Sequence, residues 1–126
     1  MKFFLNMFVA TAVLMLSIAF TPGTQASIVG IWEAPDLENS TIQVYQATDG
    51  FFYGKIIESD REDWIGEIIL KETAYDPANQ AWRGEIYSLR RFFTVDAVLT
   101  LESTNKLKLV GTKFFMSKTF YWNRRS

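Results

Sequence analysis

Polar and apolar residues alternate along most of the chain beyond residue 40, which is the pattern of β-strands with one buried face. The clearest example is the stretch 94–102, where the apolar residues recur at every second position. Turn-forming residues separate the alternating stretches, as at 48–50 and 76–80. The pattern predicts about eight strands, at residues 28–33, 41–46, 51–58, 67–75, 81–87, 94–102, 106–109 and 118–124.

No window of residues 27–126 combines helical spacing of apolar residues with capping residues, so the sequence predicts an all-β domain. Short connections favour antiparallel neighbours, and a meander of this size closes into a small up-and-down barrel. Closure removes the exposed strand edges that invite aggregation. An eight-stranded barrel is filled by its own side chains or holds one small ligand. A sandwich of two sheets is the alternative.

The N-terminus has the features of a cleavable secretory signal over residues 1–26. Lys2 precedes an apolar run at 3–20, and a Pro-Gly break followed by small residues then leads to Ser27. We therefore expect a mature domain at 27–126, located in the periplasm or secreted, with no membrane span after cleavage. The alternative is a retained anchor, because the apolar run is just long enough to cross a bilayer.

The absence of Cys and His from the chain removes several kinds of chemistry. It excludes disulfides, thiolate metal sites, thiol nucleophiles and histidine bases. The acidic cluster at 60–64 lacks the spacing of a calcium loop, so we expect a solvated loop there. Carboxylates such as Glu58, Glu72 and Glu85 lie on predicted strands, but nothing in the sequence brings two of them together. We therefore predict no catalytic residue, no metal site and no cofactor.

Charge is divided unevenly between the two halves of the expected domain. Residues 27–80 hold 11 acidic and 3 basic side chains, whereas residues 81–126 hold 3 acidic and 9 basic ones. This division predicts either an electrically divided surface or neighbouring strands that neutralise one another. Nucleic-acid binding is not expected, because the domain is acidic as a whole and its basic residues form no run with stacking aromatics.

The strongest local signal pairs the two ends of the domain. Gly30 and Trp32 lie on the first predicted strand, and Trp122 and Arg124 lie on the last. First and last strands are neighbours in a closed barrel, where a guanidinium over an indole contributes roughly 0.5–2 kcal/mol. We expect Arg124 to lie across Trp32 and to seal one end of the barrel, as a structural pair.

This pairing resembles the lipocalin and calycin barrels, which carry a Gly-x-Trp on the first strand and an Arg on the last. A closer resemblance is to the DUF2147 family of bacterial secreted, lipocalin-like domains of unknown function. The segments that carry it are 28–32, 52–56, 82–87 and 118–124. The chain departs from that family at 88–94, where members usually have Asp-Pro and a Gly-Lys-x-Tyr hairpin, and it lacks their frequent Cys pair. The resemblance implies a barrel and a cell-envelope location, and it supplies no activity.

Two further features bear on a binding site. Glycines interrupt the strand pattern at Gly54, Gly84 and Gly111, where they leave room for a ligand or let large neighbours pack. Phenylalanine doublets occur at 51–52, 92–93 and 114–115. Neighbours on a strand face opposite sides, so one ring of each doublet should point outward unless a turn intervenes. Outward rings near loops would form an adhesive rim for a ligand, membrane or partner, and ordinary packing is the alternative.

We predict a binding module without enzymatic activity, for a small apolar or amphipathic ligand. The residues expected to line its cavity are Trp82, Ile86, Val95, Leu99, Leu109, Phe120 and Trp122. Arg90 and Arg91 are candidates for gripping an anionic head group at the open rim. The alternative is an interaction or structural domain of the envelope with a packed barrel and no ligand.

Overall fold

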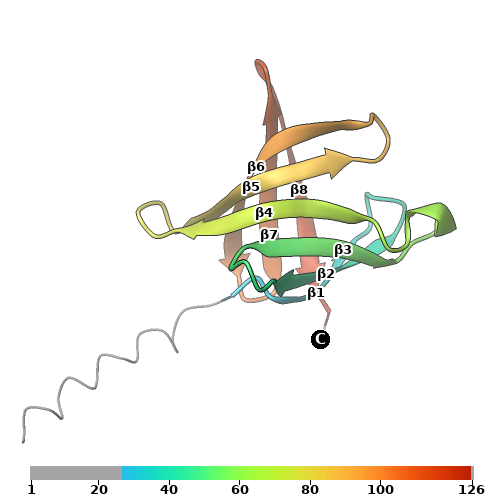
Figure 1. Cartoon of the computed structure of the whole chain (residues 1–126), viewed down its shortest axis with the longest axis horizontal. Helices are drawn as coiled ribbons and strands as arrows, with labels where there is room; N and C mark the ends of the chain where they lie inside the picture. The colour runs from blue at the N-terminus through green and yellow to red at the C-terminus, as the bar shows by residue number, and fades with distance from the viewer. Residues whose placement is uncertain (1–26, 126) are drawn as a thin grey trace, which may run out of the picture.

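The computed structural model describes residues 27–125 and shows a closed barrel of eight strands (Figure 1). The strands are β1 (Gly30–Ala34), β2 (Ser40–Gln46), β3 (Phe52–Glu58), β4 (Ile68–Asp76), β5 (Ala81–Ser88), β6 (Phe93–Ser103), β7 (Lys106–Lys113) and β8 (Met116–Arg124). Each strand pairs antiparallel with the next, and β8 returns to pair with β1. The predicted all-β meander barrel is therefore confirmed. The predicted signal segment lies outside the described residues. Within those residues, no helix has the length and apolar character needed to cross a membrane.

The last hairpin is longer than the sequence pattern predicted. β7 continues to Lys113, four residues past the predicted end at 109, and β8 begins at Met116 rather than at 118. The alternation stops after 109, yet the backbone of 110–112 pairs with both β6 and β8, and Lys113 pairs with Met116 of β8. Backbone pairing on both sides holds this segment extended without an apolar stripe.

The acidic segment between β3 and β4 is only partly a solvated loop. It contains a short 3₁₀ helix, η1 (Glu62–Trp64), in which Trp64 is buried. The Arg61 guanidinium lies 4.7 Å from the centre of the Trp64 ring. One aromatic side chain therefore anchors an otherwise exposed and charged segment to the barrel.

The two ends of the barrel differ. One end receives the chain at 27–30 and holds the β2–β3, β4–β5 and β6–β7 connections, and we call it the closed end. The other holds the β1–β2, β3–β4, β5–β6 and β7–β8 connections, and we call it the open end.

Arg124 seals the closed end. Its guanidinium carbon lies 4.4 Å from the centre of the Trp32 ring, as the sequence led us to expect. The same group donates hydrogen bonds to three carbonyl oxygens, those of Ser27 (2.8 Å), Val29 (2.9 Å) and Thr104 (2.9 Å). Arg124 thus ties the entry segment, the first strand and the β6–β7 turn to the last strand.

Gly30 makes room for this contact. A Cβ atom at this position would lie 2.6 Å from Nη1 of Arg124, and its φ of +150° is one that other residues rarely adopt. The backbone pairing between β1 and β8 is short, with only Trp32 opposite Arg124 and Glu33 opposite Asn123. Closure of the barrel therefore depends on the side chain of Arg124 as well as on the strand ladder.

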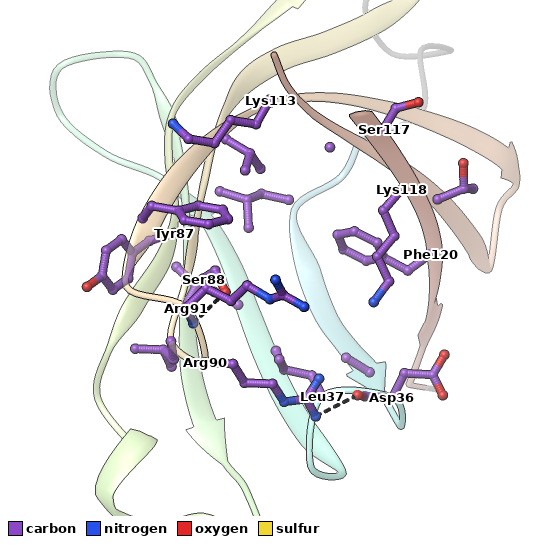
Figure 2. A pocket seen from close by; sticks show the side chains of 18 of the residues that line it. Asp36, Leu37, Tyr87, Ser88, Arg90, Arg91, Lys113, Ser117, Lys118 and Phe120 are labelled. Carbon is purple, nitrogen blue, oxygen red and sulfur yellow. Dashed lines mark hydrogen bonds between the residues drawn. The ribbon is translucent and has the colours of Figure 1, made fainter. Parts of the chain in front are cut away.

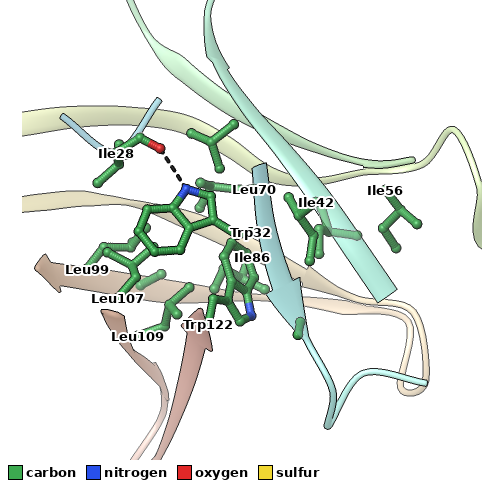
Figure 3. Close-up of a cluster of buried hydrophobic side chains, with 14 of the residues drawn as sticks. Ile28, Trp32, Ile42, Ile56, Leu70, Ile86, Leu99, Leu107, Leu109 and Trp122 are labelled. Carbon is green, nitrogen blue, oxygen red and sulfur yellow. Dashed lines mark hydrogen bonds between the residues drawn. The ribbon is translucent and has the colours of Figure 1, made fainter. Parts of the chain in front are cut away.

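The hydrophobic core surrounds Trp32 in the interior of the barrel (Figure 3). Trp32 is fully buried, and its indole nitrogen donates a hydrogen bond of 2.8 Å to the Ile28 carbonyl. Ile28 covers the indole from the entry segment. The fully buried aliphatic residues around them are Ile42, Ile56, Leu70, Leu99, Leu107 and Leu109.

Salt bridges join the acidic and basic halves of the chain at their seams. Arg83 pairs with Asp76 between β5 and β4, and Arg125 reaches both Glu33 (3.1 Å) and Glu58 (2.9 Å). The hydrogen bond from Arg125 lowers the pKa of Glu58 below its ordinary value. Strands β7 and β8, by contrast, carry no carboxylate. The seams are neutralised, and the β7–β8 side of the barrel stays basic.

We expect Arg124→Met to lower the free energy of unfolding by about 2 kcal/mol, because it removes a cation–π contact and three hydrogen bonds to carbonyl groups. Chemical denaturation of the variant and the parent protein measures this difference. Arg83→Met is the matched control, and its exposed ion pair with Asp76 should matter little. Equal effects of the two substitutions would contradict the role assigned to Arg124.

Candidate functional site

A cavity of about 730 Å³ opens at the open end of the barrel (Figure 2). Ligand pockets in proteins typically measure about 300–1,000 Å³, so this one is large enough for a small molecule. Its walls come mainly from β5, β6, β7 and β8, and loop residues such as Leu37 and Leu89 border the opening. The barrel is therefore packed in its closed half and hollow in its open half.

The structure separates the predicted lining residues into two groups. Four of them line the cavity: Ile86, Val95, Phe120 and Trp122. The other three belong to the packed core and do not border the cavity: Trp82, Leu99 and Leu109. Ile86 and Trp122 belong to both the core and the cavity wall. Alternation assigned all seven to the inner face correctly, but it carries no information on depth along the barrel axis. The three residues nearer the closed end pack in the core that surrounds Trp32.

Two of the glycines that interrupt the strand pattern lie in different surroundings. Gly111 lines the cavity, and a Cβ atom there would lie 3.1 Å from Cγ2 of Val95, so the glycine lets β7 pack closely against β6 beside the cavity. Gly84 serves close packing, because a Cβ atom there would lie 2.8 Å from the Cα of Thr73. Thr73 sits where the register between β4 and β5 shifts, so the glycine accommodates a bulge in the neighbouring strand.

The two arginines predicted for the rim have different surroundings. Arg90 donates hydrogen bonds to the Glu38 carboxylate (2.8 Å) and to the Asp36 carbonyl (3.2 Å). These contacts connect the β5–β6 loop to the β1–β2 loop, which comes from the opposite side of the eight-stranded barrel. Arg90 therefore links the two loops across the mouth of the cavity, and Glu38 neutralises its charge.

Arg91 points into the mouth of the cavity, and Lys118 approaches the same space from β8 (Figure 2). Among residues 27–125, neither side chain has a carboxylate within the 4 Å of a salt bridge. Lys118 was not among the residues predicted for the site. Its signal was the alternation along β8, which puts Lys118 on the same face as Phe120 and Trp122.

Lys113 is a third cation at the mouth. Its ammonium nitrogen lies 5.2 Å from the centre of the Phe93 ring and 5.0 Å from that of Phe114. The same nitrogen donates a long hydrogen bond of 3.4 Å to the Thr94 carbonyl. The positive charge at this side of the mouth is therefore flanked by aromatic rings.

The rim of the open end is apolar as well as charged. Phe92, Phe114 and Met116 are each more than three-quarters exposed, and Phe115 is fully exposed. In the 92–93 doublet one ring points out and the other lines the cavity, as the strand pattern predicted. In the 114–115 doublet both rings are exposed, because they form the turn between β7 and β8.

The opposite side of the rim is acidic. The β3–β4 connection holds Asp60, Glu62, Asp63 and Glu67, and β3–β4 lies across the barrel from β7–β8. Arg61 donates two hydrogen bonds to Asp63, which lower the pKa of this carboxyl and keep it ionised. The described residues include no group of acidic side chains that is arranged to hold a metal ion.

Comparison with known proteins supports the fold. A similar solved structure is that of the protein HP1028 from the human pathogen Helicobacter pylori, which is described as belonging to the lipocalin family. The two structures agree with a TM-score of 0.64 at 16% sequence identity, over 80% of this chain and 84% of that one. No protein-family model matches the chain, and no curated protein matches it. The lipocalin-like barrel is confirmed, and the resemblance to the DUF2147 family stays a prediction.

Two substitutions on one face of β6 test the division into a packed and a hollow half. Val95→Phe should change the melting temperature little, because the new ring enters the cavity. Leu99→Phe, four residues further along the same strand, should destabilise by about 1–3 kcal/mol through overpacking. Thermal unfolding measures both, and equal destabilisation would show that the region around Val95 is as tightly packed as the core.

Proposed function

We propose that this domain binds a small amphipathic anion, such as a long-chain fatty acid, and acts by binding rather than by catalysis. The observation that carries the proposal is the combination of an apolar cavity with cations at its mouth that have no carboxylate partner among residues 27–125, of which Arg91 and Lys118 point into the opening. The apolar part of the ligand would lie against Phe120 and Val95. Its charged head would meet the two cations.

Simple energetics favour such a ligand. Each methylene group transferred from water into the cavity contributes about 0.8 kcal/mol. A hydrogen bond to a charged group contributes about 1.5–3 kcal/mol, and an arginine can engage a carboxylate with two of them. A neutral hydrocarbon would gain the first contribution without the second. Selectivity for an anion would therefore come from the mouth, and affinity for a long chain from the cavity.

Two further points support a carrier or sensor of this kind. Eight-stranded barrels of the lipocalin type are the size that holds one small ligand, and HP1028, which shares the fold, is described as a lipocalin. The apolar N-terminal segment favours a location in the periplasm or outside the cell. A ligand of low solubility that must cross an aqueous compartment needs this kind of shelter.

The alternative of an interaction domain with a packed barrel agrees less well with the cavity. A packed barrel would leave no space of about 730 Å³ behind the rim. It would also give no reason for an inward-directed Lys118 beside Phe120.

We expect the protein to bind palmitate more tightly than the alcohol of the same chain length, since only palmitate carries a charge for the mouth. Arg91→Gln and Lys118→Gln should each weaken palmitate binding roughly tenfold, which corresponds to the loss of one charge-assisted hydrogen bond. They should leave binding of the alcohol unchanged. Displacement of a fluorescent fatty-acid probe measures all these affinities.

Lys108→Gln is the matched control, because Lys108 lies on the outer face of β7 between two fully buried inward residues. It should not alter palmitate affinity. If palmitate fails to displace the probe, or if Lys108→Gln weakens binding as much as Lys118→Gln does, the proposed site is wrong.

A further inference from the structure

The β7–β8 hairpin projects from the barrel (Figure 1). The residues at its tip, 114–116, are apolar. Lys113 pairs with Met116, so Phe114 and Phe115 form a two-residue turn. Phe114 is 85% exposed, Met116 is 77% exposed, and Phe115 is fully exposed. Three consecutive large apolar side chains in water mark a surface that another apolar phase covers.

The backbone of the rim supports a role for these rings outside the fold. Phe114 has a φ of +58°, at a turn position where glycine is the usual residue. Phe92, on the neighbouring rim loop, has a φ of +61°. A bulky residue in this conformation costs stability, and these two exposed rings regain little through packing. Such local conflicts concentrate at functional positions.

The distribution of charge around the hairpin indicates which apolar phase would cover its tip. Lys113 and Lys118 lie beside the tip, and Arg91 lies on the β5–β6 loop of the same end. Residues 106–125 include no acidic side chain that would offset these charges. The acidic β3–β4 connection lies on the opposite side of the same rim. An anionic surface would attract the hairpin side and repel the other side, which would orient the molecule with the hairpin foremost. A basic segment with aromatic residues at its tip has the two features that anchor proteins to anionic membranes.

We propose that the tip of the β7–β8 hairpin, Phe114 to Met116, inserts into the surface of an anionic phospholipid bilayer. Lys113 and Lys118 flank the tip at the level of the lipid head groups. The cavity mouth, which Phe114 and Met116 also border, then opens toward the membrane. Docking requires no ligand, whereas exchange of an amphipathic anion between bilayer and cavity rests on the proposed function.

Co-sedimentation with vesicles tests this proposal. The protein should bind vesicles of phosphatidylcholine mixed with phosphatidylglycerol, should bind vesicles of phosphatidylcholine alone far less, and should lose binding as salt is added. Phe115→Ser should weaken binding to the anionic vesicles roughly tenfold, by removing one inserted ring. Intact mass is measured first, because a retained segment 1–26 would itself bind lipid.

Phe51→Ser is the matched control. Phe51 is an exposed ring in the β2–β3 connection at the closed end, so its loss should not affect binding. Phe114→Asn should weaken vesicle binding while maintaining or raising the melting temperature, because Asn tolerates a positive φ. If the Phe114 ring served only the stability of the fold, the substitution would instead lower both vesicle binding and the melting temperature.

Several outcomes overturn the docking proposal. These are no binding to anionic vesicles, equal binding to both vesicle types, or equal effects of Phe115→Ser and Phe51→Ser. Self-association that Phe115→Ser abolishes in the absence of vesicles would assign the tip to a second copy of the chain instead.

The two proposals fail separately. Phe115 does not line the cavity, so Phe115→Ser should bind palmitate from solution normally. Palmitate binding without vesicle binding overturns the docking proposal alone. Vesicle binding without palmitate binding overturns the proposed function alone.

Discussion

The contact between Arg124 and Trp32 is the interaction on which the rest of this barrel depends. Backbone pairing between β1 and β8 is limited to two residue pairs, so the strand ladder alone closes the barrel weakly. The guanidinium covers the indole and binds three carbonyl groups, two from the entry segment and one from the β6–β7 turn. The chain has no Cys, so no disulfide shares this task.

Closure at one end determines where the barrel is hollow. Large side chains gather around Trp32 and fill the closed half, whereas the open half has Gly111 and Val95 on its walls. The cavity consequently opens at the end where the hairpin and the β5–β6 loop supply basic and aromatic residues. An apolar hollow behind a cationic mouth suits the amphipathic anion proposed as its ligand, and the exposed rings beside it suit the proposed contact with a membrane surface.

Much of the fold was predictable from the sequence, because alternation reports directly which residues face inward. The Trp32–Arg124 contact was predictable too, since closing a meander brings its first and last strands together. The depth of a residue along the barrel axis was not predictable from alternation. Trp82, Leu99 and Leu109 were therefore assigned to the cavity, although they pack in the core. The ion pair between Arg90 and Glu38 could not be predicted from the sequence either. The two residues are 52 positions apart, on two loops whose shapes no local pattern specifies. Lys118 could have been predicted as a site residue, since it continues the inward face of β8.

We have proposed that the open half of this barrel shelters an amphipathic anion. Native mass spectrometry of the protein purified without detergent from the cells that make it tests this claim most directly. We expect a second species, heavier by the mass of one anionic amphiphile, which disappears when the protein is denatured. A single species at the mass of the bare chain, unchanged after incubation with an excess of palmitate, would contradict it.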